Sequence, residues 1–409
     1  MRPKVLLLTH RLPFPPNRGD RIRAFHMLRF LSKHADVFLG SVADEPWLEE
    51  HAAALREYCR EISIHRLPPK GRWVRAAAGL AGRRSATEGA FFSRPLASQV
   101  RQWTKDHRLD AAVIYCSSMG QYSKSFSTRP RRVLVDLVDV DSQKWDDYAD
   151  STKGLKRLLY RREAHRVRHL ERRLSTDADA VSVVSHDEAN LFQSCHEGHM
   201  AYALSNGVDH SFFAPDALHE NLWLPCRLGK PQMVFVGVLD YLPNVQGLQW
   251  FCEAVLPLIL REYPDAVLQI VGRRPSLAVR ALGEMAGVQL IGEVEDVRPH
   301  VLAADFAIAP LKIARGIQNK VLEALSCGRP VIATSEAATG IDSRGGMFIA
   351  DTPLAWMETL KKLECEKQHS EAKEMARGGI VEQYSWDAQL SPILEMLELR
   401  QGHYLGPQA

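Results

Sequence analysis

The chain has 409 residues, 45% of them hydrophobic and 25% charged, which is an ordinary globular composition long enough for two or three domains. No run of about 18 uncharged apolar residues occurs, so the sequence contains no ordinary transmembrane helix. The net charge is only +3, yet residues 1–200 hold 34 Lys/Arg against 24 Asp/Glu, and the remainder holds 18 against 25. A basic half implies an anionic partner such as phospholipid headgroups, a lipid pyrophosphate or nucleic acid.

The N-terminus lacks a signal-peptide pattern, because residues 4–8 run straight into Thr9, His10 and Arg11. The seven cysteines are scattered without a Cys-x-x-Cys pair, which argues against structural zinc and suits a reducing compartment. We therefore expect a soluble, cytoplasmic protein.

Short apolar runs alternate with helix-like stretches in two successive series, the rhythm of parallel sheets covered by helices. The first series of expected strands comprises residues 5–8, 37–40, 62–64, 112–115, 133–137 and 181–184. The second series comprises residues 233–236, 267–271, 288–291, 306–309, 330–333 and 347–349. Two doubly wound α/β units fit this order better than one long sheet.

A stretch rich in turn formers, residues 205–215, separates the two series. We therefore expect an N-terminal Rossmann-like domain over residues 1–205 and a C-terminal one over residues 206–384. A further apolar helix is expected within residues 385–409, with Ser385 as its N-cap.

The first expected strand runs into residues 10–20, a loop that precedes a helix over about residues 22–33. Ligands bind at the carboxyl ends of the strands in open α/β sheets. Three prolines stiffen this loop, and Gly19 would let a ligand approach the backbone. The sequence favours a ligand-binding loop, and a plain surface loop is the alternative.

The expected strand at residues 133–137 leads into Asp139 and Asp141. Three uses of this Asp-x-Asp triplet are open: a metal site, a polar active-site edge, or a turn or capping role. Asp177 and Asp179 have the same spacing where a helix turns into a strand, which shows how readily the triplet arises. We therefore expect no metal.

Residues 153–173 form a basic segment, with nine Lys/Arg against Glu163 and Glu171. Apolar residues recur in it at helical spacing, namely Leu155, Leu158, Leu159, Val167 and Leu170. A basic amphipathic helix can lie on an anionic membrane surface. The alternative is a solvated helix face.

In the second half, the expected strand at residues 233–236 ends at Gly237, and residues 307–333 read as a strand, a glycine turn at Gly316, a helix and a strand. The unpaired amides of a helix start and the positive end of its dipole suit a pyrophosphate. Glu323, about two turns further along, could accept both hydroxyls of a ribose. An ordinary strand-helix-strand unit with a surface glutamate is the alternative.

The order of a small-residue turn, a helix start, Glu323 and then residues 328–331 (Gly-Arg-Pro-Val) resembles the nucleotide-sugar site of retaining glycosyltransferases of family 4. That family has the GT-B fold, which implies two Rossmann-like domains facing a cleft and a C-terminal helix that crosses back to the first domain. The turn-rich linker after residue 205 is similar to the family's linker between domains. The resemblance makes residues 10–20 the first loop of the family, which lies between acceptor and donor, so Arg18, Arg21 and Arg23 could hold an acceptor phosphate.

This chain departs from the family pattern in two respects. The places of a usual Arg and Lys after Gly237 hold Val238 and Asn244, and the first position of the usual Glu-x7-Glu pair is Arg315. The phosphate charge must then be met by other cations. The resulting candidates are, for the donor, Gly237, Arg273, Arg274, Gly316, Ile317, Gln318 and Glu323; for the acceptor, His10, Arg18, Gly19 and Asp141; and for catalysis, Asp139, Arg315 and Lys320.

Three segments, residues 13–20, 139–145 and 309–324, together resemble the sugar transferases of bacterial exopolysaccharide loci that accompany PEP-CTERM/exosortase systems. The resemblance implies transfer of a sugar from a nucleoside diphosphate sugar to a lipid-linked or oligosaccharide acceptor with retention of configuration. We expect no cofactor and, since no convincing ligand cluster occurs, no metal. The basic amphipathic pattern of residues 153–173 makes a peripheral contact with an anionic membrane possible. The competing functions are a GT-B nucleotide-sugar epimerase or hydrolase and a non-catalytic nucleotide-sugar-binding protein. Nucleic acid is not expected as a partner, because no stacking platform or recognition motif accompanies the charge.

Overall fold

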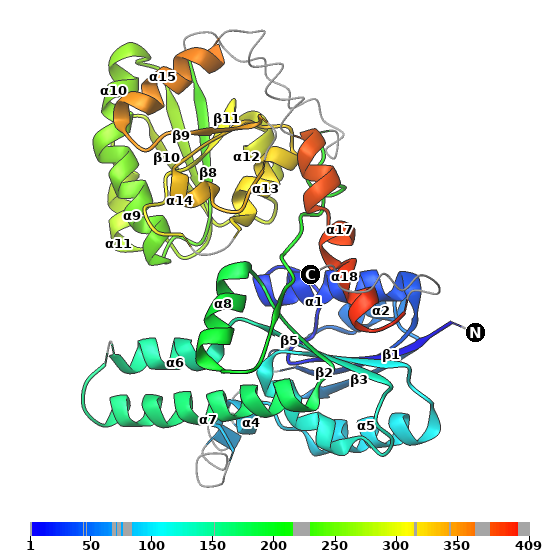
Figure 1. Cartoon of the computed structure of the whole chain (residues 1–409). Coiled ribbons are helices and arrows are strands. Elements are labelled where there is room, and N and C mark those ends of the chain that lie inside the picture. Colours follow the sequence, from blue (N-terminus) through cyan, green and yellow to red (C-terminus); the bar gives the residue numbers. More distant parts are fainter. Residues whose placement is uncertain are drawn as a thin grey trace. The chain divides into compact units, whose positions relative to one another are not determined.

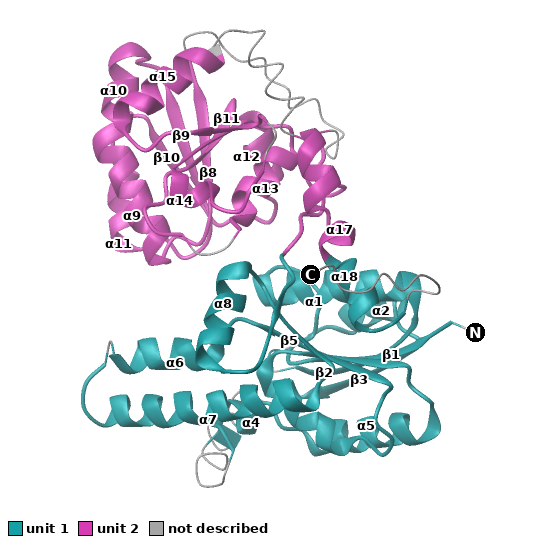
Figure 2. Ribbon diagram, viewed as in Figure 1, with its two compact units in different colours: residues 1–205, 390–409 teal, residues 206–389 magenta. Residues whose placement is uncertain are grey.

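The computed structural model describes residues 2–43, 45, 47–67, 71, 75–76, 84–150, 152–215, 230–314, 317–342, 345–364 and 377–399. The chain divides into two compact units, one of Met1–Ser205 with Leu390–Ala409 and the other of Asn206–Gln389 (Figure 2). Each unit has its own sheet and its own hydrophobic core. The chain returns to the first unit at Leu390, five residues after Ser385, where the sequence predicted the start of the last segment.

The first unit is built on a seven-stranded sheet in the order β3-β2-β1-β4-β5-β6-β7, and every pairing in it is parallel. The strands are β1 (Lys4–Thr9), β2 (Asp36–Ala43), β3 (Glu61–Arg66), β4 (Ala111–Tyr115), β5 (Arg132–Val138), β6 (Ala180–Val183) and β7 (Tyr202–Ala203). The six predicted strands are confirmed. The sequence pattern missed β7, because two residues, one of them an exposed tyrosine, make no apolar run.

Helices lie on both sides of this sheet (Figure 1). They are α1 (Gly19–His34), α2 (Glu49–Arg56), α4 (Ala86–Ala90), α5 (Arg94–Asp106), the 3-10 helix η1 (Ser117–Ser125), α6 (Asp141–Asp150), α7 (Leu155–Asp177), α8 (His186–Cys195) and α18 (Pro392–Met396). The expected helix over residues 22–33 is part of α1. No helix in the described ranges is both long and apolar enough to span a bilayer.

The second unit is built on a six-stranded parallel sheet in the order β10-β9-β8-β11-β12-β13. Its strands are β8 (Gln232–Val236), β9 (Val267–Val271), β10 (Val288–Gly292), β11 (Phe306–Ala309), β12 (Val331–Ala333) and β13 (Met347–Ile349). The helices are α9 (Leu242–Trp250), the π-helical segment η2 (Phe251–Val255), α10 (Leu256–Glu262), α11 (Leu277–Leu282), α12 (Arg298–Ala303), α13 (Asn319–Ser326), α14 (Ser335–Ala338), α15 (Pro353–Glu364) and α17 (Trp386–Leu390). All six strands match the predicted runs.

The last expected helix is present in two pieces, α17 and α18. Ser385 caps α17, because its Oγ accepts the N–H of Ala388 at 3.3 Å. Pro392 has no N–H to donate to the preceding turn, so α17 ends and α18 begins at this proline. The N-cap prediction is confirmed, and the predicted single helix is corrected to two short ones.

Both sheets have the strand order of a Rossmann fold, with a reversal of direction at the centre. In the first unit the order reverses between β1 and β4, and in the second between β8 and β11. At such a point the loops leave in opposite directions and open a crevice at the carboxyl ends of the strands. The predicted fold class, two doubly wound Rossmann-like units, is therefore confirmed.

Candidate functional site

The turn after β8 is formed by two glycines whose backbones touch. Gly237 donates its N–H to Val271 O at 3.0 Å, which joins the ends of β8 and β9. Gly272 has φ +152°, and a Cβ added there would lie 1.7 Å from Gly237 O. Only glycine fits at position 272, so the backbone of the Gly237 turn is fixed by close packing.

Lys320, from the first turn of α13, brings its ammonium group to this turn. Its Nζ donates to Asn244 Oδ1 at 2.6 Å and lies 4.3 Å from the ring centre of Phe235. Asn244 Nδ2 in turn donates to Val238 O at 2.9 Å. A Cβ added to Gly237 would lie 3.2 Å from Nζ, which shows how close the ammonium is to the turn. Burial lowers the pKa of Lys320 to about 7, and the negative charge of Glu323 acts in the other direction by raising it.

Glu323 lies one turn after Lys320, on the same side of α13. The helix begins at Asn319, with the N–H groups of Val321 and Leu322 bonded to Gln318 O at 2.9 and 3.3 Å. Glu323 is therefore about one turn from the helix start, and not two turns as the sequence suggested. Burial raises the pKa of Glu323 to about 7, and the positive charge of Lys320 opposes the shift.

These residues stand at the reversal point of the second sheet, between β8 and β11. A cation beside a glycine turn suits a diphosphate, and a carboxylate one helical turn away can accept the hydroxyls of a ribose. Two ionisable groups with pKa values near 7, one helical turn apart in a partly buried site, are typical of a functional site.

The other predicted donor residues are placed as follows. Arg273 and Arg274 lie on the loop after β9, and Arg273 O accepts the N–H of Leu239 at 2.9 Å. Arg274 has φ +56°, an uncommon conformation for a residue other than glycine, and its exposed side chain pairs with Asp240 at 3.2 Å. Ile317 and Gln318 directly precede α13. Arg315 and Gly316 lie outside the described residues.

In the first unit, His10 and Arg11 follow β1 and meet Asp20. Arg11 Nη1 donates to Asp20 Oδ2 at 2.5 Å, and His10 Nε2 lies 3.5 Å from the same oxygen. Burial would raise the pKa of Asp20, but the hydrogen bonds from His10 and Arg11 hold it well below its usual value. His10 is buried and stacks on Tyr115 with ring centres 5.7 Å apart.

Arg18 and Gly19 lie at the start of α1. Arg18 Nη1 donates to Glu45 Oε1 at 2.7 Å, and Arg21 Nη2 donates to Glu45 Oε2 at 2.6 Å. Gly19 has open space around it, because an added Cβ would meet nothing within 4 Å. The two arginines share one carboxylate, so an acceptor phosphate would have to compete with Glu45 for them.

Arg23 does not fit the predicted role of an acceptor-binding residue. It is fully buried, and its Nε donates to Asp136 Oδ2 at 2.8 Å. This ion pair ties α1 to β5 in the interior of the unit. The prediction for Arg23 was wrong. The resemblance of the first loop to the family grouped Arg23 with Arg18 and Arg21, whereas α1 turns Arg23 inward to a buried partner.

Asp139 and Asp141 follow β5 at the carboxyl edge of the first sheet. Asp139 is exposed, whereas Asp141 is partly buried and accepts a hydrogen bond from Ser117 Oγ at 2.7 Å. Burial raises the pKa of Asp141 to about 6, although the hydrogen bond from Ser117 lowers it. A carboxylate with this pKa can accept a proton near neutral pH.

The backbone is strained at this edge. Cys116, after β4, has φ +74°, and Val138, at the end of β5, has φ +70°. Such conformations cost of the order of 1–3 kcal/mol for residues other than glycine, and they concentrate at functional sites. Burial and the carboxylates around it, among them Asp141 and Asp20, raise the pKa of the Cys116 thiol well above its usual value. The loops after β1, β4 and β5 therefore meet around Cys116.

Two further observations limit where a ligand or metal would bind. No group of three or more His, Cys, Asp or Glu residues suited to a metal ion exists within the described ranges.

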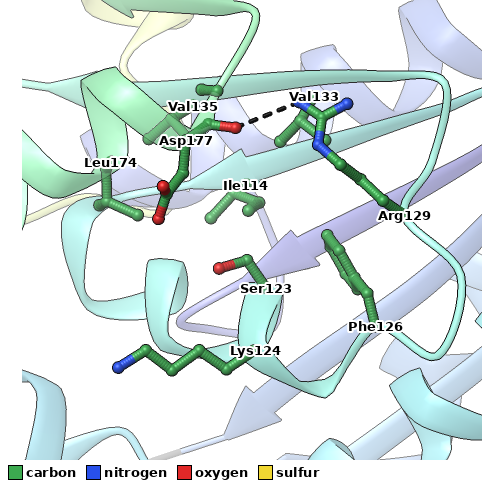
Figure 3. Close-up of a pocket in the computed structure, with 10 residues that line it drawn as sticks. Ile114, Ser123, Lys124, Phe126, Arg129, Val133, Val135, Leu174 and Asp177 are labelled. Atoms are coloured by element: carbon green, nitrogen blue, oxygen red, sulfur yellow. Dashed lines mark hydrogen bonds between the residues drawn. The ribbon is translucent and has the colours of Figure 1, made fainter.

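A cavity of 360 Å³ opens against the first sheet (Figure 3). It is lined by Ile114, Ser123, Lys124, Phe126, Arg129, Val133, Val135, Leu174, Asp177 and Ala178. None of the predicted site residues lines this cavity.

The chain is similar to known proteins in sequence and in fold. Residues 230–364, which contain Gly237, Lys320 and Glu323, match the family described as Glycosyl transferases group 1. The chain is 22% identical over 357 residues to an uncharacterized 44.6 kDa protein in the cps region of Klebsiella pneumoniae, covering 84% of this chain and 86% of that one.

Solved structures with the same fold include three from bacteria. A glycosyltransferase from Rickettsia africae superposes with a TM-score of 0.65 and 13% identity, covering 97% of this chain and 98% of the other. Sucrose-phosphate synthase from Thermosynechococcus elongatus superposes with a TM-score of 0.61 and 15% identity, covering 97% of this chain and 98% of the other. Anabaena Alr3699/HepE, in complex with UDP and glucose, superposes with a TM-score of 0.59 and 14% identity, covering 96% of this chain and 99% of the other. The fold is therefore GT-B, and within the second unit residues 230–364 match the glycosyl transferases group 1 family.

One residue in each unit contacts a predicted site residue but was not recognised from the sequence. Asn244 was read only as the absence of a lysine, yet its amide bridges Val238 O and Lys320 Nζ. Ser117, the partner of Asp141, follows β4 in a stretch without a recognised motif. A polar residue just after an expected buried strand was the available signal in the case of Ser117.

Proposed function

We propose that the protein is a retaining glycosyltransferase of family 4 that moves a sugar from a nucleoside diphosphate sugar to a lipid-linked or oligosaccharide acceptor. The observation that carries this proposal is the placement of Lys320 Nζ at the Gly237 turn by Asn244, with Glu323 one turn further along α13. The match of residues 230–364 to the glycosyl transferases group 1 family supports the same function.

In this proposal Lys320 holds the donor diphosphate and Glu323 accepts the ribose hydroxyls. The bond between the anomeric carbon and the diphosphate oxygen breaks as the acceptor hydroxyl oxygen bonds to that carbon, and the hydroxyl proton passes to the leaving diphosphate oxygen. Negative charge then grows on the leaving diphosphate, and a cation already in place stabilises it without reorganisation. Arg273, Arg274 and Arg315 are the further cations we assign to this charge. A helix dipole of roughly half a charge would not balance two phosphates by itself.

We assign the acceptor to the first unit, at the carboxyl edge formed by the loops after β1 and β5. His10, Arg18 and Gly19 belong to the first loop, and Asp139 and Asp141 to the other. The strained backbone at this edge and the Asp141 carboxylate with its pKa of about 6 support a functional role. The proposed reaction needs neither a metal nor a cofactor.

The biological setting we infer is bacterial exopolysaccharide synthesis on the cytoplasmic side of the membrane, in the subgroup that accompanies PEP-CTERM/exosortase systems. The relative in the Klebsiella pneumoniae cps region supports a polysaccharide role. The Anabaena structure, a complex with UDP and glucose, supports a nucleotide-sugar donor.

A screen of nucleotide sugars tests this function. Thermal shift first identifies the donor, since a ligand that binds only the folded state raises the melting temperature. Release of nucleoside diphosphate is then measured with and without saccharide and polyprenyl-phosphate-linked acceptors. Release that depends on an acceptor supports the transferase, whereas equal release without one favours a hydrolase and a changed sugar without release favours an epimerase. Binding without turnover of any donor would favour a non-catalytic nucleotide-sugar-binding protein.

A further inference from the structure

Helices α6 and α7 form an antiparallel hairpin that extends beyond the sheet of the first unit (Figure 1). Three leucines in the first two turns of α7 face solvent: Leu155 is 80% exposed, Leu158 65% and Leu159 51%. Residues at this i, i+3, i+4 spacing share one side of a helix. Isolated exposed leucines are common, but three on one helical face make a contiguous apolar strip.

The apolar strip is confined to the tip. Further along the same helix Val167 and Leu170 are buried in the core of the unit. The amphipathic segment predicted over residues 153–173 is therefore two segments with different roles. Its second half packs against the protein, and only its first half has an apolar face open to a partner.

An aromatic cluster stands beside the strip. Trp145 and Tyr148 from α6 and Tyr160 from α7 contact one another, with ring centres 5.5 to 6.1 Å apart. Tyr148 is 45% exposed. Tyrosine and tryptophan rings are enriched at the interface between lipid headgroups and acyl chains, because one end of each ring is apolar and the other polar.

The exposed side of α7 near the strip is positive because both glutamates of this helix turn inward. Glu163 is buried and accepts the N–H groups of Ala86 and Thr87, each at 2.8 Å. Glu171 is buried and accepts the N–H of Ser142 at 3.0 Å. Neither carboxylate offsets the cations on the exposed side of the helix.

The cations near the tip are exposed, namely Lys153, Lys156, Arg157 and Arg161. Asp150 pairs with Arg157 at 3.7 Å and with Arg161 at 3.3 Å. All three of these side chains are about half exposed or more, so the pairs are weak and lipid phosphates can compete for the arginines. Over the whole hairpin, residues 141–177, ten Lys/Arg stand against seven Asp/Glu.

We propose that the tip of the α6–α7 hairpin docks on an anionic phospholipid surface. The three leucines enter the headgroup region, the aromatic cluster lies at its boundary, and the surrounding cations contact lipid phosphates. Helix α6 begins at Asp141, at the carboxyl edge of the first sheet, and its ten residues span about 15 Å. Docking of the tip would therefore hold this edge within about that distance of the lipid headgroups. The assignment does not depend on the donor chemistry.

Vesicle cosedimentation of the full chain tests the proposal without any measurement of turnover. Vesicles of one-third phosphatidylglycerol in phosphatidylcholine are compared with pure phosphatidylcholine, at low and at high salt. We expect binding to the anionic vesicles to be at least about tenfold stronger than to the neutral ones, and to fall with salt, because several cations act together.

Two variants separate the apolar contribution to vesicle binding from the electrostatic one. The triple change Leu155→Gln, Leu158→Gln and Leu159→Gln should weaken binding to anionic vesicles about tenfold, because it removes the apolar anchor. The double change Lys153→Gln and Lys156→Gln should weaken binding and reduce its salt dependence. A matched control is Leu277→Gln, which removes a leucine that is 86% exposed in the second unit and should leave binding unchanged.

All these side chains are exposed, so each variant should keep the parent melting temperature, which is measured alongside. Equal binding to neutral and anionic vesicles would overturn the proposal. So would unchanged binding of the triple leucine variant, or binding to duplex DNA with none to vesicles.

Discussion

Replacing Lys320 by Met separates a ligand-binding lysine from a structural one. Methionine keeps an unbranched apolar chain of similar length over Phe235, so the packing at the Gly237 turn is retained. It removes the one ammonium that the structure places at this turn, among the residues it describes. The change therefore takes away charge with little loss of volume.

The expected loss of affinity follows from the contact that is removed. A hydrogen bond to a charged group contributes about 1.5–3 kcal/mol, which is roughly a 10- to 150-fold increase in Kd for the nucleoside diphosphate. The free energy of unfolding should fall by less than about 1 kcal/mol, because the lost hydrogen bond to Asn244 is offset by removal of a charge that burial disfavours.

Proton linkage provides a second readout. Since the pKa of Lys320 is lowered to about 7, the free protein at pH 8 holds this lysine mostly neutral, and a bound diphosphate would restore its proton. Binding should therefore take up protons at pH 8, and affinity should fall as the pH rises from 7 to 9. Lys320→Met should abolish the uptake.

The assay is isothermal titration calorimetry with UDP, GDP and ADP, in buffers of different ionisation enthalpy. Lys361→Met is the control, because Lys361 forms an exposed ion pair with Glu262 at 2.8 Å on α15 in the same unit. Parent-like affinity in a folded Lys320→Met protein would refute the diphosphate assignment. A large fall in the melting temperature with unchanged affinity would show that Lys320 is structural.

Three further predictions concern single features of the two units. Glu323→Gln should weaken nucleoside diphosphate binding by about 1–3 kcal/mol and leave inorganic pyrophosphate binding unchanged, because only the former has a ribose; equal losses for both ligands in calorimetry would remove the ribose role. Turnover should survive EDTA, and complete loss on chelation, restored by Mn²⁺ or Mg²⁺, would support a metal at Asp139 and Asp141. Arg23→Met should destabilise the protein by about 3–5 kcal/mol in denaturant titration, because it leaves Asp136 buried without its partner; a stable variant with weakened acceptor binding would contradict the buried, structural role.

The strands were predictable because apolar runs of three to five residues recur between turn formers, and burial on both faces makes β4 apolar throughout. The predicted ligand loops followed from the same rhythm, since residues 10–20 and the turns at Gly237 and Gly316 each come directly after an expected strand. The order of the strands in each sheet was not predicted. The start of α13 was less predictable. The glycine at 316 suggested the helix start, but the first helical hydrogen bonds are made to Gln318.

Side-chain partners across the sheet were beyond sequence pattern. The inward turn of Arg23 depends on Asp136, which lies 113 residues away in the chain, and the position of Lys320 depends on Asn244, 76 residues away. The same holds for residues 153–173. Their composition predicted one amphipathic helix, but only tertiary packing decides that Val167 is in the core and Leu155 in solvent.

The central claim is a nucleotide-sugar site at the β8–β11 reversal point, and a crystal structure with a bound nucleoside diphosphate tests it most directly. The account predicts the diphosphate within hydrogen-bond distance of Lys320 Nζ beside the Gly237 turn, and the ribose hydroxyls on Glu323. A nucleotide bound elsewhere, or one whose phosphates do not approach Lys320, would contradict it.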